Sequence, residues 1–141
     1  MSRLVLDASV ILKWYLNTGD EADLPVARAI LEEWMADRVN IILPPHALAE
    51  VASVLASERA EDAGAAFSQL QTLFANSVDN PNADTWQLAI RLSITLNHHL
   101  FDTLYHAMAL ALDATLVTAD ERYQTKANSL GHIVLLRDLQ L

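Results

Sequence analysis

Short apolar runs alternate along this chain with longer stretches of helical periodicity. Brief apolar runs bounded by polar or proline residues indicate buried strands at 3–6, 41–43, 116–117 and 133–136. Between these runs, apolar residues return every three or four positions, which predicts helices over 9–16, 25–34, 46–59, 61–76, 84–96, 102–112 and 121–129. The alternation predicts an α/β fold with a short, mostly parallel central sheet that is covered by helices on both faces.

Four acidic residues interrupt this apolar pattern. Asp7 and Asp120 each fall just past the end of a predicted strand, whereas Glu50 and Asp102 belong to predicted helices. A carboxylate taken out of water costs several kcal/mol unless it is paired, hydrogen-bonded or bound to a cation. Because ligand sites in open α/β sheets lie outside the carboxyl ends of the strands, Asp7 and Asp120 can stand on one edge. The pattern predicts that the fold gathers the four acids around a cation.

Mutual repulsion strengthens the case for a divalent ion. Two carboxylates about 4 Å apart interact by roughly 4 kcal/mol at an effective dielectric of 20. Magnesium removes this conflict while keeping several waters, and one or two such ions can activate water and stabilise a leaving oxygen. With no cysteine in the chain, the ligands are limited to oxygen and imidazole, which favours Mg²⁺ or Mn²⁺. Such a site suits phosphodiester hydrolysis.

The composition narrows the class of protein further. A length of 141 residues predicts one domain over 1–141, and the hydrophobic fraction of 52% indicates a self-association surface. No apolar run approaches the roughly 18 residues of a membrane span, and Asp7 and Lys13 interrupt any signal peptide, so we expect a cytoplasmic protein without membrane contact. The net charge of −9 argues against affinity gained by neutralising many phosphates. It remains compatible with an acidic pocket that collects metal ions and a few local basic contacts.

Each acid taken alone has an ordinary explanation. Asp7 and Asp120 could cap the helices that follow them, and Glu50 could be solvated or half of an ion pair. Only the four acids together favour a metal site. His106, four residues after Asp102, is interpreted as a surface or supporting histidine rather than a ligand.

Other aromatic residues have structural interpretations. His98 and His99 are most simply an exposed helix end. The three tryptophans, Trp14, Trp34 and Trp86, are most simply core or dimer packing.

The segments around the acids resemble the ordered acidic motifs of a known family. Residues 5–10, 48–51, 101–109 and 116–122 are similar to those of PIN-domain ribonucleases, particularly VapC-type toxins of bacterial toxin–antitoxin pairs. The resemblance extends over essentially the whole chain. It implies a PIN-like three-layer α/β/α sandwich, Mg²⁺- or Mn²⁺-dependent endoribonuclease activity on RNA, homodimerisation and inhibition by a cognate antitoxin.

The resemblance also implies roles for individual residues. The metal-binding and catalytic acids would be Asp7, Glu50, Asp102 and Asp120. Ser9 and Thr118 match positions whose small hydroxyl helps to order the site, and Glu121 would be an auxiliary acid. An antitoxin would cover the apolar surface of the helices near Glu50 and Phe67.

Basic residues follow the strand ends that carry Asp7 and Asp120. We expect Lys13 and Arg122 to line the rim of the pocket and contact RNA phosphates, whereas Lys126 is more simply a solvated charge. No motif specifies which RNA would be cut.

Three other classes compete with this interpretation. A catalytically silent PIN-like binding protein would keep the fold without activity. A receiver-like Mg²⁺-binding signalling domain needs a lysine past a late strand and a central phosphoacceptor aspartate, and neither stands at the right place. A haloacid-dehalogenase-like phosphatase needs an aspartate two residues after Asp7, where this chain has Ser9.

Overall fold

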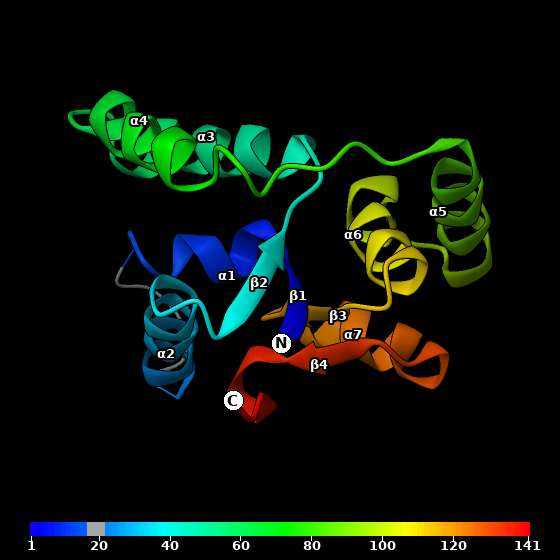
Figure 1. Cartoon of the computed structure of the whole chain (residues 1–141). Helices are drawn as coiled ribbons and strands as arrows, with labels where there is room; N and C mark the ends of the chain where they lie inside the picture. The colour runs from blue at the N-terminus through cyan, green and yellow to red at the C-terminus, as the bar shows by residue number, and fades with distance from the viewer. Residues whose placement is uncertain (17–21) are drawn as a thin grey trace.

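A parallel sheet forms the centre of the molecule. The computed structural model describes residues 1–16 and 22–141 (Figure 1). The described strands are β1 (Ser2–Leu6), β2 (Val39–Ile42), β3 (Thr115–Thr118) and β4 (Ile133–Leu135), and their order in the sheet is β2-β1-β3-β4. All three strand pairs are parallel, so the four predicted strands are confirmed.

Helices connect and cover these strands. They are α1 (Ala8–Leu12), α2 (Asp23–Met35), α3 (His46–Glu58), α4 (Ala63–Leu73), α5 (Ala83–Leu96), α6 (Leu100–Ala111) and α7 (Glu121–Ala127), with short 3₁₀ turns at Asn128–Leu130 and Leu136–Asp138. The bounds of several helices differ from prediction: α1 ends at Leu12, α4 is shorter than the predicted 61–76, and α2 begins two residues before Pro25. Pro25 is tolerated there because the first turn of a helix leaves its N–H groups without intrahelical partners.

The strand order creates a switch point between β1 and β3. From β1 the chain crosses to β2 on one side, and it later returns to β3 on the other side. Leu6, the last residue of β1, pairs with Val117 of β3, so these two strands end side by side. Ligand sites in open α/β sheets lie at such a point, outside the carboxyl ends of the strands.

The remaining layers place two further helices near this edge. Helix α6 packs against β1 and β3, while α1 lies between β1 and α3. The antiparallel pair α3 and α4 extends along one side of the molecule, and α5 lies against α6 (Figure 1). Both α3 and α6 can therefore direct side chains toward the ends of β1 and β3.

Aromatic rings from three segments of the chain pack together in the core. The rings of Trp14 and Trp34 stack on Phe74, with centroid separations of 6.0 and 4.7 Å, which confirms core packing for these two tryptophans. Trp86 instead lies on the surface of α5 with 40% of its area exposed. Among the described residues, no helix is both long and apolar enough to span a membrane.

The exposed apolar surface lies elsewhere than the sequence suggested. An apolar surface for an antitoxin was expected on the helices near Glu50 and Phe67, which are α3 and α4, but Phe67 is only partly exposed. The stripe on α5 is more exposed: Trp86 and Ile90 are each 40% exposed and Ile94 is 76% exposed. These residues recur every four positions, which places them on one face of the helix.

Candidate active site

Asp7 connects the end of β1 to α1. It caps α1, and its Oδ1 accepts hydrogen bonds from the backbone N–H of Ser9, at 3.0 Å, and from the Ser9 hydroxyl. Burial raises the pKa of this carboxyl from 3.8 to about 6; the hydroxyls of Ser9 and Thr118 oppose the shift, and Asp102 adds to it. Asp7 therefore resists ionisation in the absence of a cation.

Asp120 occupies the matching place after β3. It caps α7 by accepting a hydrogen bond from the N–H of Tyr123 at 3.1 Å, and its own N–H donates to the Thr118 hydroxyl at 3.0 Å. The hydroxyl of Ser9 also accepts from the N–H of Ala119 at 3.1 Å, which ties the two strand ends together. Both aspartates thus combine capping with a place at the same sheet edge.

Glu50 reaches the site from α3. Its Oε1 accepts a hydrogen bond from the Tyr105 hydroxyl at 3.1 Å and lies 3.2 Å from Nε2 of His46. Burial and the carboxylates of Glu50 and Asp7 raise the pKa of Tyr105, so this phenol remains a neutral hydrogen-bond donor. Tyr105 lies on α6, so its hydroxyl fixes Glu50 against the helix that carries Asp102.

Asp102 lies at the electrostatic centre of the cluster. It stands in the first turn of α6, and burial raises its pKa; the hydrogen bond and charge of His98 oppose this shift, whereas Glu50 and Asp120 add to it. Asp102 in turn contributes to the raised pKa of the Asp7 carboxyl. Asp102 therefore interacts electrostatically with each of the other three predicted acids, and a metal site shared by all four stays a prediction.

Two predicted auxiliary residues, Ser9 and Thr118, lie within this group and bond to the capping aspartates. Glu121 differs, because its carboxylate pairs with Arg137 and its side chain is 62% exposed. An auxiliary role for Glu121 stays a prediction, and the ion pair with Arg137 is a structural explanation for this residue.

The predicted basic side chains line two separate cavities. Lys13 forms an ion pair with Asp23 at 3.6 Å and lines a cavity of about 400 Å³ together with Ser9 and Asp120. Arg122 lines a second cavity of about 460 Å³ with Lys126. Lys126 was interpreted as a solvated charge, but its Nζ donates to the Asn97 carbonyl at 2.9 Å.

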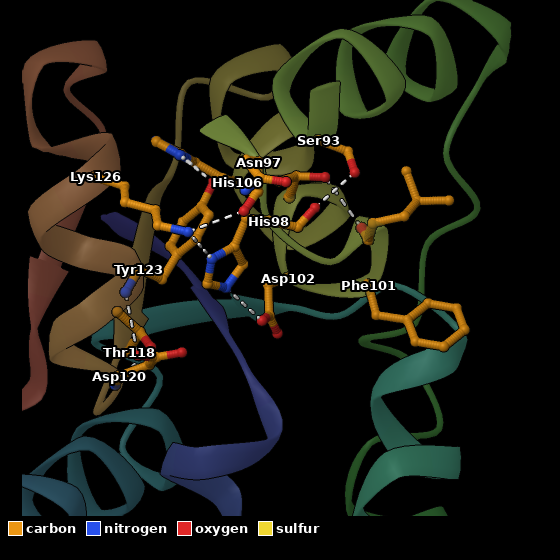
Figure 2. Close-up of polar contacts among 12 residues, drawn as sticks. Ser93, Asn97, His98, Phe101, Asp102, His106, Thr118, Asp120, Tyr123 and Lys126 are labelled. Atoms are coloured by element: carbon orange, nitrogen blue, oxygen red, sulfur yellow. Dashed lines mark hydrogen bonds and ion pairs between the residues drawn. The ribbon is translucent and has the colours of Figure 1, made fainter. Parts of the chain in front are cut away.

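His98 is the residue that sequence reasoning missed. It was interpreted as part of an exposed helix end, yet its side chain is only 7% exposed and its Nε2 lies 2.8 Å from Oδ2 of Asp102. Ligand atoms of His98, Asp102 and Asp120 all lie within 4.8 Å of one another (Figure 2). The spacing of four residues between His98 and Asp102 was the available signal. Such a spacing places two side chains together only within a helix, and His98 precedes α6.

His106 is also more buried than a surface histidine. Its ring is fully buried and bonds through Nδ1 to the Tyr123 hydroxyl at 2.9 Å and through Nε2 to the Gly131 carbonyl at 2.8 Å. Burial lowers its pKa, which favours the neutral ring. His106 therefore anchors Tyr123, whose ring meets the edge of His98 at a centroid distance of 4.8 Å, and it takes no place among the acids.

The chemistry of this donor set fits a divalent cation. The lysine and arginine side chains that form ion pairs among the described residues do so with Asp23, Glu33, Asp62 and Glu121. The hydrogen-bond partners of the four acids among these residues are hydroxyl, amide and imidazole groups. Electrostatic repulsion between Asp102 and the other three acids disfavours the ionised carboxylates. Carboxylate oxygens are the ligands that Mg²⁺ and Mn²⁺ prefer.

The fold and the site together define a class of protein, namely α/β proteins with a carboxylate cluster at the switch point of a parallel sheet. Residues 4–128 match the family model described as PIN domain. The chain belongs to the PIN domain family. Membership of this nuclease family supports a hydrolase that acts on nucleic acids.

Solved structures share this fold at low identity. A structure of FitAB bound to the IR36 DNA fragment has a TM-score of 0.73 and 16% identity, with 98% of each chain covered. FitAcB from Neisseria gonorrhoeae has a TM-score of 0.66 and 18% identity, covering 96% of this chain and 99% of that one. VapC20 of Mycobacterium tuberculosis, a Sarcin-Ricin loop cleaving toxin, has a TM-score of 0.62 and 16% identity, covering 86% and 93%. Comparison with curated protein sequences gives no match.

Proposed function

We propose that this protein is a Mg²⁺- or Mn²⁺-dependent endoribonuclease that hydrolyses RNA phosphodiester bonds and acts as the toxin of a toxin–antitoxin pair. The observation that supports the proposal is that Asp102 interacts electrostatically with Asp7, Glu50 and Asp120. Family membership supports nucleic acid as the substrate, and the likeness to a toxin that cleaves the sarcin–ricin loop supports RNA. A catalytically silent relative would have no reason to keep four mutually repelling acids in one group.

The four acids would hold the cation between them. When bound, a divalent ion lowers the pKa of a water and stabilises the charge that develops on the leaving oxygen. The chain's own residues prepare the ligands: Ser9 orients Asp7, and Tyr105 orients Glu50. No serine or cysteine nucleophile is required for this chemistry.

Approach of the RNA depends on a few basic side chains. Lys13 lines a cavity together with Asp120, and Arg122 lines a cavity together with His98, the neighbour of Asp102, so each could meet a phosphate of the strand. A small number of such contacts is compatible with a net charge of −9. We propose these two residues as RNA contacts, and we expect the protein to act in the cytoplasm.

The proposed partners are a second copy of the chain and a cognate antitoxin. The stripe of Trp86, Ile90 and Ile94 on α5 supports a homodimer interface, since an exposed apolar patch of this kind marks an interaction site. An antitoxin that inhibits the enzyme would need to cover the acids or the cavities beside them.

Cleavage of RNA by the purified protein tests the proposal. We expect cutting with Mg²⁺ or Mn²⁺, none in excess chelator, and a loss of about a hundredfold or more in Asp102→Asn and Glu50→Gln, because each removes charge from the group that holds the cation. Asp113→Asn is a matched control, since it makes the same change at a side chain that is 94% exposed. Equal cutting in chelator, or by Asp102→Asn, would refute the proposed mechanism.

A further inference from the structure

His98 lies between a lysine and the central aspartate of the acid cluster. Its Nδ1 lies 3.2 Å from Nζ of Lys126, and its Nε2 lies 2.8 Å from Oδ2 of Asp102 (Figure 2). The two contacts use both ring nitrogens. They link α7, the turn after α5 and the first turn of α6 through one side chain.

The lysine decides which ring nitrogen carries the proton. An ammonium group has three donors and no acceptor, so Nδ1 of His98 must accept from Lys126. In the neutral ring the proton then sits on Nε2, which donates to Oδ2 of Asp102. The positive charge of Lys126 is thereby transmitted to Asp102 by two hydrogen bonds that run in one direction.

Additional contacts hold the imidazole in this position. The backbone of His98 is fixed because its carbonyl accepts from the Ser93 hydroxyl at 2.6 Å. Asn97 precedes it in the left-handed region at φ 49°, and the Asn97 carbonyl accepts from the same Lys126 ammonium at 2.9 Å. The ring itself meets the Tyr123 ring edge-on and is almost completely buried. This degree of fixation is unnecessary for a solvated histidine.

We propose that His98 is a positioning residue for Asp102, with Lys126 fixing its tautomer. Holding Oδ2 by a donor orients the Asp102 carboxylate toward the other acids and leaves its second oxygen available. His98 would not itself bind the cation, because ligation through either nitrogen would break one of its two hydrogen bonds. The link to catalysis rests on the proposed function, whereas the relay from Lys126 to Asp102 does not.

Two substitutions separate the functions of the two ring nitrogens. His98→Gln places an amide nitrogen near the position of Nε2 and retains a donor to Asp102. His98→Asn reaches only the position of Nδ1, so it can still accept from Lys126 but cannot reach Asp102. Both variants are polar and uncharged, so they form a matched pair.

Titration calorimetry with Mn²⁺ on the full chain provides the first readout. Loss of a hydrogen bond that orients a metal ligand typically costs tenfold to a hundredfold in metal affinity, so we expect a weakening of about that size in His98→Asn and nearly wild-type affinity in His98→Gln. Equal weakening in both variants would mean that the imidazole is itself a ligand, which contradicts the proposal. Wild-type affinity in both would reduce His98 to a packing role and also contradict it.

Nitrogen-15 NMR of the imidazole gives a second readout without metal or RNA. We expect His98 of the wild-type protein to show the tautomer protonated at Nε2 at mildly alkaline pH, and a mixture of tautomers in Lys126→Gln. A wild-type ring protonated at Nδ1 would overturn the relay even if every variant failed to fold. If the relay is observed but the wild-type protein never cuts RNA, the proposed function fails and the positioning of Asp102 stands.

Discussion

The Asp7 carboxyl shows how one residue of the site opposes folding. Its pKa is raised to about 6 in the folded protein, chiefly by burial, against an ordinary value of 3.8. The folded state therefore favours the protonated acid, and ionisation at neutral pH costs stability of about 3 kcal/mol. A bound cation would offset this cost, which is the behaviour expected of a metal ligand.

Substitution of this residue gives a prediction with a defined sign. A raised carboxyl pKa contributes stability that is fully present below pH 3.8 and is lost as the pH rises through about 6. Asp7→Asn removes the charge and keeps a side-chain oxygen for capping α1. Without metal and above pH 6, we expect the variant to melt no lower than wild type, with the difference disappearing near pH 4.

Thermal melts over a pH series in chelator measure this effect. The same melts with Mn²⁺ should show a smaller metal-induced rise in the melting temperature for Asp7→Asn than for wild type. If wild type gained stability over the variant as the pH rose, the electrostatic account of Asp7 would be wrong.

At the scale of the element, the site depends on where helices begin. Asp7 caps α1, Asp120 caps α7 and Asp102 stands in the first turn of α6. A helix N-terminus carries partial positive charge, which favours a carboxylate, but burial outweighs this effect at Asp7 and Asp102, whose pKa values are raised. Structural and chemical roles therefore coincide in the same residues, and substitutions must be chosen to separate them.

Asp120 allows such a separation. Asparagine is as good a helix cap as aspartate, whereas alanine in place of either costs about 1 kcal/mol. We expect Asp120→Asn to lose RNA cleavage with little change in stability, and Asp120→Ala to lose both cleavage and about 1 kcal/mol. Denaturant unfolding alongside the cleavage assay measures the two effects. Cleavage retained by Asp120→Asn would limit this residue to capping α7.

The strand ends made only part of the site predictable from the sequence. The positions of Asp7 and Asp120 followed from the strand pattern, because parallel strands end at one edge. The approach of Glu50 did not, since its bond to Tyr105 spans 55 residues and depends on how α3 packs. His98 was missed because it precedes α6, beyond a left-handed residue, where helical spacing gives no guidance.

At the scale of the whole molecule, the surface carries one consistent apolar stripe on α5. The composition predicted a self-association surface without giving its place, and the apolar surface near Glu50 and Phe67 was expected to bind an antitoxin. Only the packing shows that Phe67 is partly covered while Ile94 remains 76% exposed. The exposure of an apolar side chain depends on which face of its helix packs against a neighbouring element. Amphipathic spacing alone does not specify which element that is.

Substitution within this stripe tests the proposed dimer. We expect Ile94→Glu to shift the mass measured by light scattering from dimer to monomer, because a charge buried within an apolar interface remains unpaired. Met35→Glu is a suitable control, since Met35 is 68% exposed at the end of α2 and makes the same change in charge. A wild-type protein that is monomeric, or an Ile94→Glu variant that stays dimeric, would contradict the assignment of α5.

The central claim is that four separate acids form one site for a divalent cation, and calorimetric titration of Mn²⁺ tests it most directly. We compare the wild-type protein with Asp102→Asn, at the centre of the cluster, and with Asp113→Asn, whose side chain is 94% exposed. The account predicts binding by wild type and Asp113→Asn, and affinity at least about tenfold weaker in Asp102→Asn. Equal affinity in all three proteins, or no binding by wild type, would contradict it.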